Sequence, residues 1–155
     1  MLKYIGAAFI LFAALLPPVE LRKRLGRINA EYAFVVRLLS GISERLGDMR
    51  TVGDYIRSID TEGVRHALES GQELISSPER VISRLSVSAE LSQALSGYFL
   101  TLGRLERTAE LSRTEKLLAM TSDEHRRVSE RLAPSLRVCG AVCLAVSLTL
   151  VIILI

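Results

Sequence analysis

The C-terminal end of the chain is a continuous apolar stretch. Residues 138–155 are 18 positions without a charged side chain, and eleven of them are Val, Leu or Ile. As a helix, this stretch spans about 27 Å, close to the thickness of a hydrocarbon core, and its aliphatic residues favour insertion by about 3 to 6 kcal/mol. A helix buried in a protein core is the alternative, but a chain of 155 residues has little room to surround one. We therefore expect residues 137–155 to form a transmembrane helix.

A second apolar stretch lies near the N-terminus and is shorter. Residues 4–16 are 13 apolar positions preceded by Lys3. A secretory signal peptide has the same basic start and apolar run, and a buried helix is a further alternative. No small-residue cleavage motif follows the run, which continues into Pro17 and Pro18. We therefore expect a transmembrane helix over residues 1–17.

Between these stretches, apolar residues recur at the spacing of helices and no alternating strand pattern is present. A repeat of 3.5 residues predicts a long helix that begins near Pro18, with a bend at the proline pair, and ends at Gly47 or Asp48. Its apolar positions are Leu21, Leu25, Ile28, Tyr32, Val35, Leu39, Ile42 and Leu46.

Start signals predict further helices along residues 18–136. Thr51 is expected to cap a second helix, and Thr61 with Glu62 to open a third that continues to Ile75. Ser77 before Pro78 predicts the next start, and Ser88 the one after it. A last helix is expected over residues 106–133, kinked at Pro134; its predicted inner face is Leu111, Leu118, Val128, Leu132 and Leu136. The predicted fold is therefore all-α, with a bundle of about six cytoplasmic helices between two transmembrane helices.

The charge distribution predicts the orientation in the membrane. Residues 18–136 hold 18 of the 20 Lys and Arg and all 17 Asp and Glu, as expected of a domain with a mixed polar surface. Basic residues gather beside both apolar stretches, so the positive-inside rule places residues 18–136 in the cytoplasm and both termini outside. The topology-determining residues are Arg22, Lys23, Arg24, Arg27, Arg126, Arg127, Arg131 and Arg137. The same residues could form a nucleic-acid patch, but aromatic residues for base stacking do not accompany them.

Small residues in the two apolar stretches are candidates for helix packing. Cys139, Cys143 and Ser147 recur every four residues, with Gly140 beside them, and a stripe of this kind lets another helix approach closely. Gly6 and Ala7 are the candidates on the first stretch. Lipid-facing filler is the equally good alternative. Two cysteines in one helix are too few for a disulfide scaffold or a metal site.

The middle of the chain contains no recognisable catalytic pattern. The phosphate-binding motif G-x-x-x-x-G-K-[ST] is absent, and no serine has a histidine at a familiar spacing. His66 and His125 are expected to be solvated or partly packed. Asp123, Glu124 and Glu130 alternate with arginines, which is typical of a salt-bridged helix surface. We therefore expect no enzyme activity, no cofactor and no metal.

The order of these features resembles one protein family. The chain opens with M-L-K-Y-I-G, continues with R-L-L-S-G-I-S-E-R-L-G-D-M-R-T-V-G-D-Y-I at residues 37–56, has T-L-G-R-L-E-R at residues 101–107, and ends in L-V-I-I-L-I. This pattern resembles stage III sporulation protein AB of endospore-forming bacteria, and the resemblance runs nearly end to end.

The resemblance implies a fold similar to the cytoplasmic domains of the platform protein of type II secretion and type IV pilus machines. It also implies membership of a secretion-like channel complex between mother cell and forespore, in the mother-cell membrane. The implied partners are a secretion-type ATPase similar to stage III sporulation protein AA, the membrane ring components and further channel subunits. A homo-oligomer is compatible with this picture.

The turn into the last helix is the candidate contact for that ATPase. Arg104, Glu106 and Arg107 lie there, and loops on a rigid scaffold are common partner sites. A merely solvated turn is the alternative. Other functions that fit the pattern are a platform component of a secretion or pilus system outside sporulation and a holin-like pore former, although the 119-residue middle is large for the latter.

Overall fold

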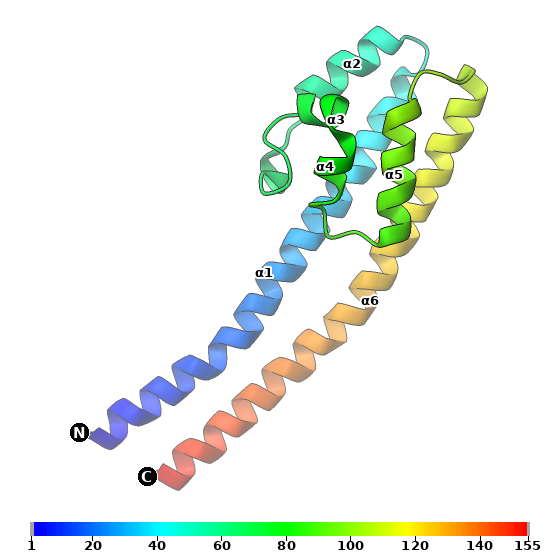
Figure 1. The fold of residues 1–155 in the computed structure, drawn as a ribbon. Helices are drawn as coiled ribbons and strands as arrows, with labels where there is room; N and C mark the ends of the chain where they lie inside the picture. The colour runs from blue at the N-terminus through cyan, green and yellow to red at the C-terminus, as the bar shows by residue number, and fades with distance from the viewer. Residues whose placement is uncertain (1, 155) are drawn as a thin grey trace. The chain divides into compact units, whose positions relative to one another are not determined.

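The chain is helical throughout its described part. The computed structural model describes the backbone of residues 2–154 and the side chains of residues 19–152, and within these limits it holds six α-helices, one short 3₁₀ helix and no strand. The helices are α1 (Leu2–Arg45), α2 (Met49–Ser58), η1 (Glu62–Val64), α3 (Gln72–Ser76), α4 (Pro78–Ile82), α5 (Ala89–Thr101) and α6 (Arg107–Leu154) (Figure 1). The predicted all-α class is confirmed.

The chain divides into two compact units. One unit, which we call the body, is Arg27–Arg126, and the other, the terminal unit, is Met1–Gly26 with Arg127–Ile155. Helices α1 and α6 each contribute to both units. The prediction that a new helix starts near Pro18 is therefore wrong, because α1 runs without interruption from Leu2 through both prolines. Helix α6 likewise continues through Pro134, which is possible because a proline removes only one hydrogen bond of the helix.

Within the body, α1 presents a wide apolar face. The predicted positions from Ile28 to Leu46 are buried, and so are Phe34 and Leu38, which the 3.5-residue repeat does not include. The face is wide because α2 to α5 and the body part of α6 gather around α1 (Figure 1). Burial on more than one side of a helix requires more apolar positions than a single seam supplies.

Helix α2 begins at a polar cap. Asp48 caps α2, where its Oδ1 accepts a hydrogen bond of 2.9 Å from the Arg50 amide, so the prediction that Thr51 is the cap is wrong. The third predicted helix is also wrong as one element, because η1 and α3 are separated by turns. Gly71 lies between them, buried, and a Cβ at this position would overlap the carbonyl oxygen of Ile56. That close approach of two backbones explains why the segment cannot form one helix of ordinary residues.

The later start signals hold. Helix α4 begins at Pro78, and Ser88 caps α5 by accepting a hydrogen bond of 3.2 Å from the Leu91 amide. Gly103, with a φ of 83°, makes the turn into α6. A positive φ is accessible to glycine at little cost, so the α5–α6 turn depends on this residue.

The inner face of α6 is polar and is shifted by one residue from the prediction. Glu110, Thr114, Leu117 and Thr121 are buried, whereas Leu111 is 36% exposed. Each buried threonine donates a hydrogen bond of 2.7 Å to the carbonyl four residues earlier in the helix. Because that bond satisfies the hydroxyl within its own helix, threonine can replace a larger apolar residue in the core.

Candidate functional site

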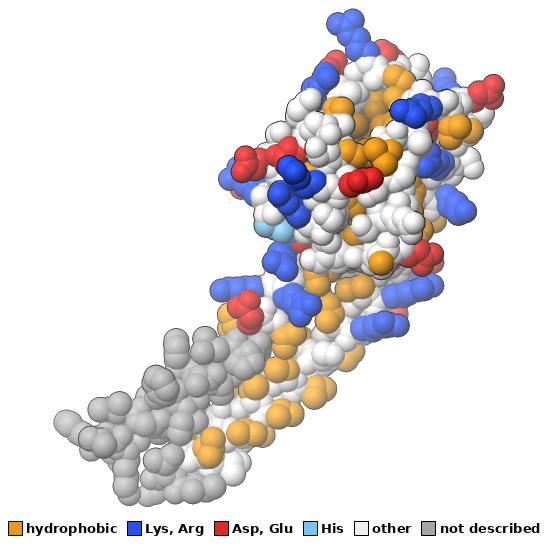
Figure 2. All heavy atoms as spheres, viewed as in Figure 1, with side chains coloured by type: hydrophobic (Ala, Val, Ile, Leu, Met, Phe, Trp, Pro, Cys, Tyr) orange, Lys and Arg blue, Asp and Glu red, His pale blue; other side chains and the backbone are white. Residues whose placement is uncertain are grey.

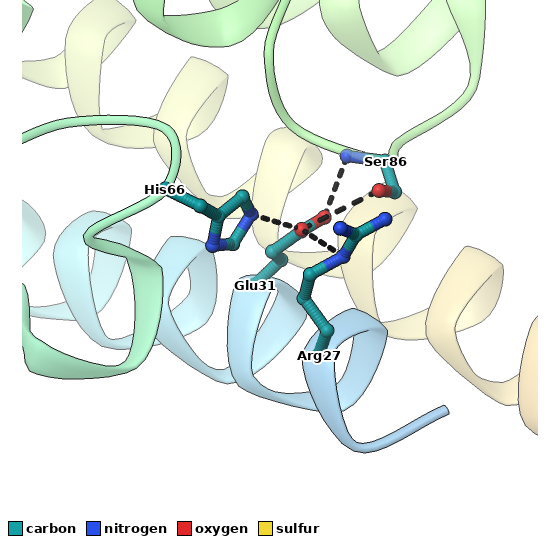
Figure 3. Close-up of polar contacts among 4 residues, drawn as sticks. All are labelled: Arg27, Glu31, His66 and Ser86. Atoms are coloured by element: carbon teal, nitrogen blue, oxygen red, sulfur yellow. Dashed lines mark hydrogen bonds and ion pairs between the residues drawn. The ribbon is translucent and has the colours of Figure 1, made fainter. Parts of the chain in front are cut away.

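A buried glutamate in the body collects the densest set of polar contacts. The side chain of Glu31, on α1, is fully buried. His66 Nε2 lies 2.6 Å from its Oε1, and the Ser86 amide donates a hydrogen bond of 2.5 Å to its Oε2. Arg27, one helical turn earlier, approaches Oε1 at 3.7 Å. Figure 3 shows His66 and Ser86 reaching Glu31 from two separate loops.

The electrostatics of this Glu31 cluster are those of a satisfied buried anion. An ionised carboxylate accepts hydrogen bonds only, so the His66 tautomer that suits this contact is the one with its proton on Nε2. The Ser86 hydroxyl adds a longer contact of 3.4 Å to Oε1. Both oxygens of Glu31 are therefore partnered, and the cluster fastens the loop after η1 and the loop between α4 and α5 to α1.

The Glu31 cluster contains the residue types of a hydrolytic triad but in a different order. In a triad, the histidine lies between the acid and the nucleophile and takes the proton of the nucleophile. Here His66 and Ser86 both bind Glu31, and the described side chains show no hydrogen bond between the two of them. This geometry supports a structural role for the cluster.

A second, half-buried carboxylate joins α6 to the start of α5. Glu124 accepts hydrogen bonds of 2.7 Å from both the amide and the hydroxyl of Ser88, and one of 2.5 Å from the phenol of Tyr32. The predicted surface salt bridge for Glu124 is therefore wrong, because the side chain turns inward; its neighbour Asp123 does pair with Arg126, at 3.2 Å.

Tyr32 is the central aromatic residue of this second cluster. Its ring stacks on His125 at a centroid distance of 5.1 Å, and His125 Nε2 lies 3.0 Å from Asn29 Oδ1. Burial and the hydrogen bond to Glu124 raise the pKa of the Tyr32 phenol well above its usual value, since its ionised form would lie in an apolar site against a carboxylate. The half-buried His125 agrees with the expectation of a partly packed histidine.

A third carboxylate, which is buried like Glu31, closes the α5–α6 turn. Glu110 Oε1 accepts a hydrogen bond of 3.0 Å from the Gly103 amide, and its Oε2 has no partner among the described residues. Next to it, the buried hydroxyls of Tyr98 and Thr114 are 2.8 Å apart. Burial raises the pKa of Tyr98.

The three candidate ATPase-contact residues lie on this turn. Arg104, Glu106 and Arg107 are exposed, and none forms an ion pair within the described part of the chain. A Cβ on Gly47 would lie 3.5 Å from Cζ of Arg107. The α5–α6 turn is therefore next to the α1–α2 turn. One end of the body therefore presents two adjoining turns.

The small-residue stripe of the second apolar stretch lies on the less exposed face of α6. Ser147 is buried, and its hydroxyl donates a hydrogen bond of 2.6 Å to the Cys143 carbonyl. Cys139, Gly140 and Cys143 are half-buried. The large aliphatic side chains at 144, 146 and 148 are more than half exposed. The side chains of Gly6 and Ala7 lie outside the described residues.

By length and composition, α6 is the one helix that could cross a membrane among the described residues that were searched. Figure 2 shows hydrophobic side chains along its terminal half. The N-terminal span expected over residues 1–17 falls on side chains that lie outside the described part, where the backbone is helical from Leu2.

The topology-determining residues are all exposed. Two of them also contact an acid in the body, Arg27 at 3.7 Å from Glu31 and Arg126 at 3.2 Å from Asp123. Among the described residues, no group of three or more His, Cys, Asp and Glu is placed to hold a metal ion.

Apolar periodicity does not reveal the buried Glu31 and Glu110 or the half-buried Glu124. Glu31 lies three residues after Ile28 and four before Val35, so its position on the buried face of α1 was readable. Glu110, Leu117 and Glu124 are spaced by seven, as are Thr114 and Thr121. A search that allowed Glu and Thr at repeat positions would have found the inner face of α6.

No family model matches this chain, and no curated protein and no solved structure matches it either. The functional argument therefore depends on the residues of the chain itself.

Proposed function

We propose that this protein is a membrane-anchored structural subunit of a secretion-like channel complex, of the stage III sporulation protein AB family. In this proposal, spans near both termini hold the body on the cytoplasmic side of the mother-cell membrane that faces the forespore. The body then couples a secretion-type ATPase similar to stage III sporulation protein AA to the ring components of the channel.

The exposed apolar surface of α6 carries the proposal. Val138, Leu144 and Ile152 are 62%, 53% and 74% exposed in a stretch without a charge. Water disfavours such a surface by roughly 25 cal/mol for each Å². A bilayer removes this cost, so the terminal half of α6 is best explained as an anchor.

The build of the body supports a scaffold. The buried Glu31 and the half-buried Glu124 fasten loops to α1 and α6, and α6 passes from the body into the anchor without a loop. A force applied to the body by an ATPase would therefore reach the bilayer through a helix. A holin-like pore former has no use for an apolar core of this size.

Tags test the anchoring and its direction. With one tag at Lys3 and another in the α5–α6 turn, external protease on intact cells should remove the first and leave the second. A cleaved signal peptide would remove the Lys3 tag from the mature chain, and an external body would expose the second tag. Either result contradicts the proposal.

Charge reversal tests the ATPase contact. Arg104→Glu with Arg107→Glu should reduce co-purification of the ATPase at least tenfold while membrane integration is unchanged. Arg65→Glu with Arg80→Glu is the matched control, since both residues are exposed elsewhere on the body. Equal ATPase recovery from both variants would show that the turn is not the contact.

Expression separates the sporulation complex from a platform component of another secretion or pilus system. The proposal expects the protein only in sporulating mother cells. Constitutive expression would favour the general platform component.

A further inference from the structure

The net positive charge of this chain lies in the terminal unit. Residues 27–126 hold thirteen Lys and Arg against fifteen Asp and Glu, a net charge of −2. The net charge of +3 for the whole chain therefore arises outside the body, where seven Lys and Arg face only Glu20 and Glu130. The body and the terminal unit therefore carry net charges of opposite sign.

Six of these basic residues form what we call the basic collar. They follow the first apolar stretch on α1 and precede the second on α6: Arg22, Lys23, Arg24, Arg127, Arg131 and Arg137. All six are exposed, and none takes part in an ion pair in the described part of the chain. Figure 2 shows Lys and Arg side chains gathered beside the hydrophobic half of α6.

The spacing of the collar matches the headgroup layer of a bilayer. Measured along the helix, Arg22 lies roughly 9 Å beyond residue 16, where the first apolar stretch ends, and Arg131 lies roughly 10 Å before residue 138, where the second begins. The headgroup region extends about 5 to 8 Å beyond the hydrocarbon on each side. Long basic side chains can reach into this layer. Arg127, roughly 16 Å from residue 138, lies roughly one Debye length beyond the headgroup layer and still interacts with its charge.

We propose that the basic collar binds the headgroups of anionic phospholipids, so that the chain gathers these lipids around its anchor. This inference rests on the membrane anchoring proposed above and adds the chemical class of the lipid partner. Phosphate groups supply the negative charge that the collar lacks within its own unit. Basic clusters beside a membrane span attract anionic lipid for this reason.

A nucleic-acid backbone is the competing partner, and the charge of the body disfavours it. Residues 27–126 carry a net charge of −2 and so add no electrostatic attraction for a nucleic acid, whereas lipid headgroups need only the collar itself. The collar is positively charged and the body has a net negative charge, and this combination favours a lipid surface over a nucleic acid.

Spin-labelled lipids test the proposal in proteoliposomes that contain the full chain in equal phosphatidylglycerol and phosphatidylcholine. We expect labelled phosphatidylglycerol to be motionally restricted about threefold more than labelled phosphatidylcholine at low salt. In about 1 M NaCl, where screening acts within roughly 3 Å, the preference should largely disappear. Equal restriction of the two lipids at low salt would overturn the proposal.

Matched variants separate the collar from the rest of the surface. The collar variant carries Arg22→Gln, Lys23→Gln, Arg24→Gln and Arg131→Gln and should lose the preference. The control variant carries Arg50→Gln, Arg65→Gln, Arg80→Gln and Lys116→Gln, which removes four exposed charges from the body and should keep it. A collar variant with an unchanged preference would contradict the proposal.

Two further measurements complete the test. Replacement of Arg22, Arg24 and Arg131 by Lys should retain the preference, because charge is the recognised property. If the protein floats with carbonate-washed vesicles but shows no lipid preference, only the lipid binding of the collar is contradicted. If carbonate removes the protein from the vesicles, the membrane anchoring is contradicted. Salt-sensitive binding of duplex DNA that the collar variant loses, without any lipid preference, would assign the collar to nucleic acid.

Discussion

The two halves of α6 bury the same kind of side chain but differ in what they expose. In the body, Glu110, Thr114 and Thr121 are buried among the other helices. In the terminal unit, Ser147 is buried while the aliphatic side chains around it are exposed, up to 74% for Ile152. Both halves hide hydroxyl groups, but only the terminal half exposes an uncharged apolar surface. The environment of each half therefore determines which side chains its exposed face carries. The exposed face of the terminal half is suited to hydrocarbon.

Most polar groups inside the body have a hydrogen-bond partner, and Oε2 of Glu110 is the exception among the described residues. Threonine hydroxyls bond within α6, and the carboxylates of Glu31 and Glu124 accept hydrogen bonds from loop amides. Such contacts fix loop positions, which an apolar core alone specifies less sharply. The following changes test the anchor and the packing of the body, in order of decreasing expected effect.

Charges on the outer face of the terminal half should abolish the anchor. Val146→Arg with Leu148→Arg places two charges near the middle of the apolar stretch, at a cost of about 5 to 7 kcal/mol, which offsets its whole insertion energy of about 3 to 6 kcal/mol. We expect alkaline carbonate to extract this variant from membranes. Ser112→Arg with Glu115→Arg, on the exposed face of the body half, should stay in the membrane fraction. Retention of both variants would contradict the anchor.

Loss of the Glu31 carboxylate should destabilise the body. Glu31→Ala leaves the Ser86 amide and His66 without their acceptor and removes about 3 kcal/mol from the free energy of unfolding. Pulse proteolysis of the full chain across a urea series measures the change. Glu115→Ala, at an exposed position, should change it by less than about 0.5 kcal/mol. If the two midpoints coincide, the Glu31 cluster does not fasten the loops.

Two glycines in the body should respond in opposite directions to alanine. Gly71→Ala forces a Cβ against the Ile56 carbonyl oxygen and should cost about 1 to 3 kcal/mol. Gly53 lies inside α2 with open space beside it, so Gly53→Ala should gain up to about 1 kcal/mol from helix propensity. Thermal unfolding of the purified chain measures both, and a neutral Gly71→Ala would refute the close backbone approach.

Alkaline pH should weaken the contact between Tyr32 and Glu124. The folded state holds the phenol proton to a higher pH than the unfolded chain, because the pKa of Tyr32 is raised. Stability from this group is therefore present below about pH 10 and is lost as the pH rises above it towards the pKa of the folded state. Tyr32→Phe should cost about 1 kcal/mol at neutral pH and should flatten the alkaline decline. Urea midpoints at pH 7 and above pH 10 test this, and an equally steep decline in the variant would contradict it.

Apolar spacing predicted the body part of α1, and cap and proline signals predicted the helix starts at Pro78 and Ser88. In these places, propensity, caps and burial agree. The same method misplaced the inner face of α6 by one residue, because Glu110, Thr114 and Thr121 occupy repeat positions and satisfy their polar groups locally. A pattern of hydrophobicity carries no information about such pairing.

Helix boundaries were the other failure. The proline pair suggested a start at Pro18, yet α1 is continuous, and the segment after Thr61 breaks where Gly71 meets the backbone of α2. The Glu31 and Glu124 clusters join residues 55 and 92 positions apart. Contacts at such separations depend on the packed fold, so they could not be predicted from local sequence.

Cysteine labelling tests the central claim most directly, that α6 anchors a cytoplasmic body. In a chain with Cys139→Ser and Cys143→Ser, a single cysteine is placed on the exposed body surface by Ser112→Cys. With a membrane-impermeant maleimide, we expect no labelling of intact cells, full labelling after lysis, and all of the labelled chain in the carbonate-washed membrane pellet. Labelling of intact cells, or recovery of the chain in the soluble fraction, would contradict the account.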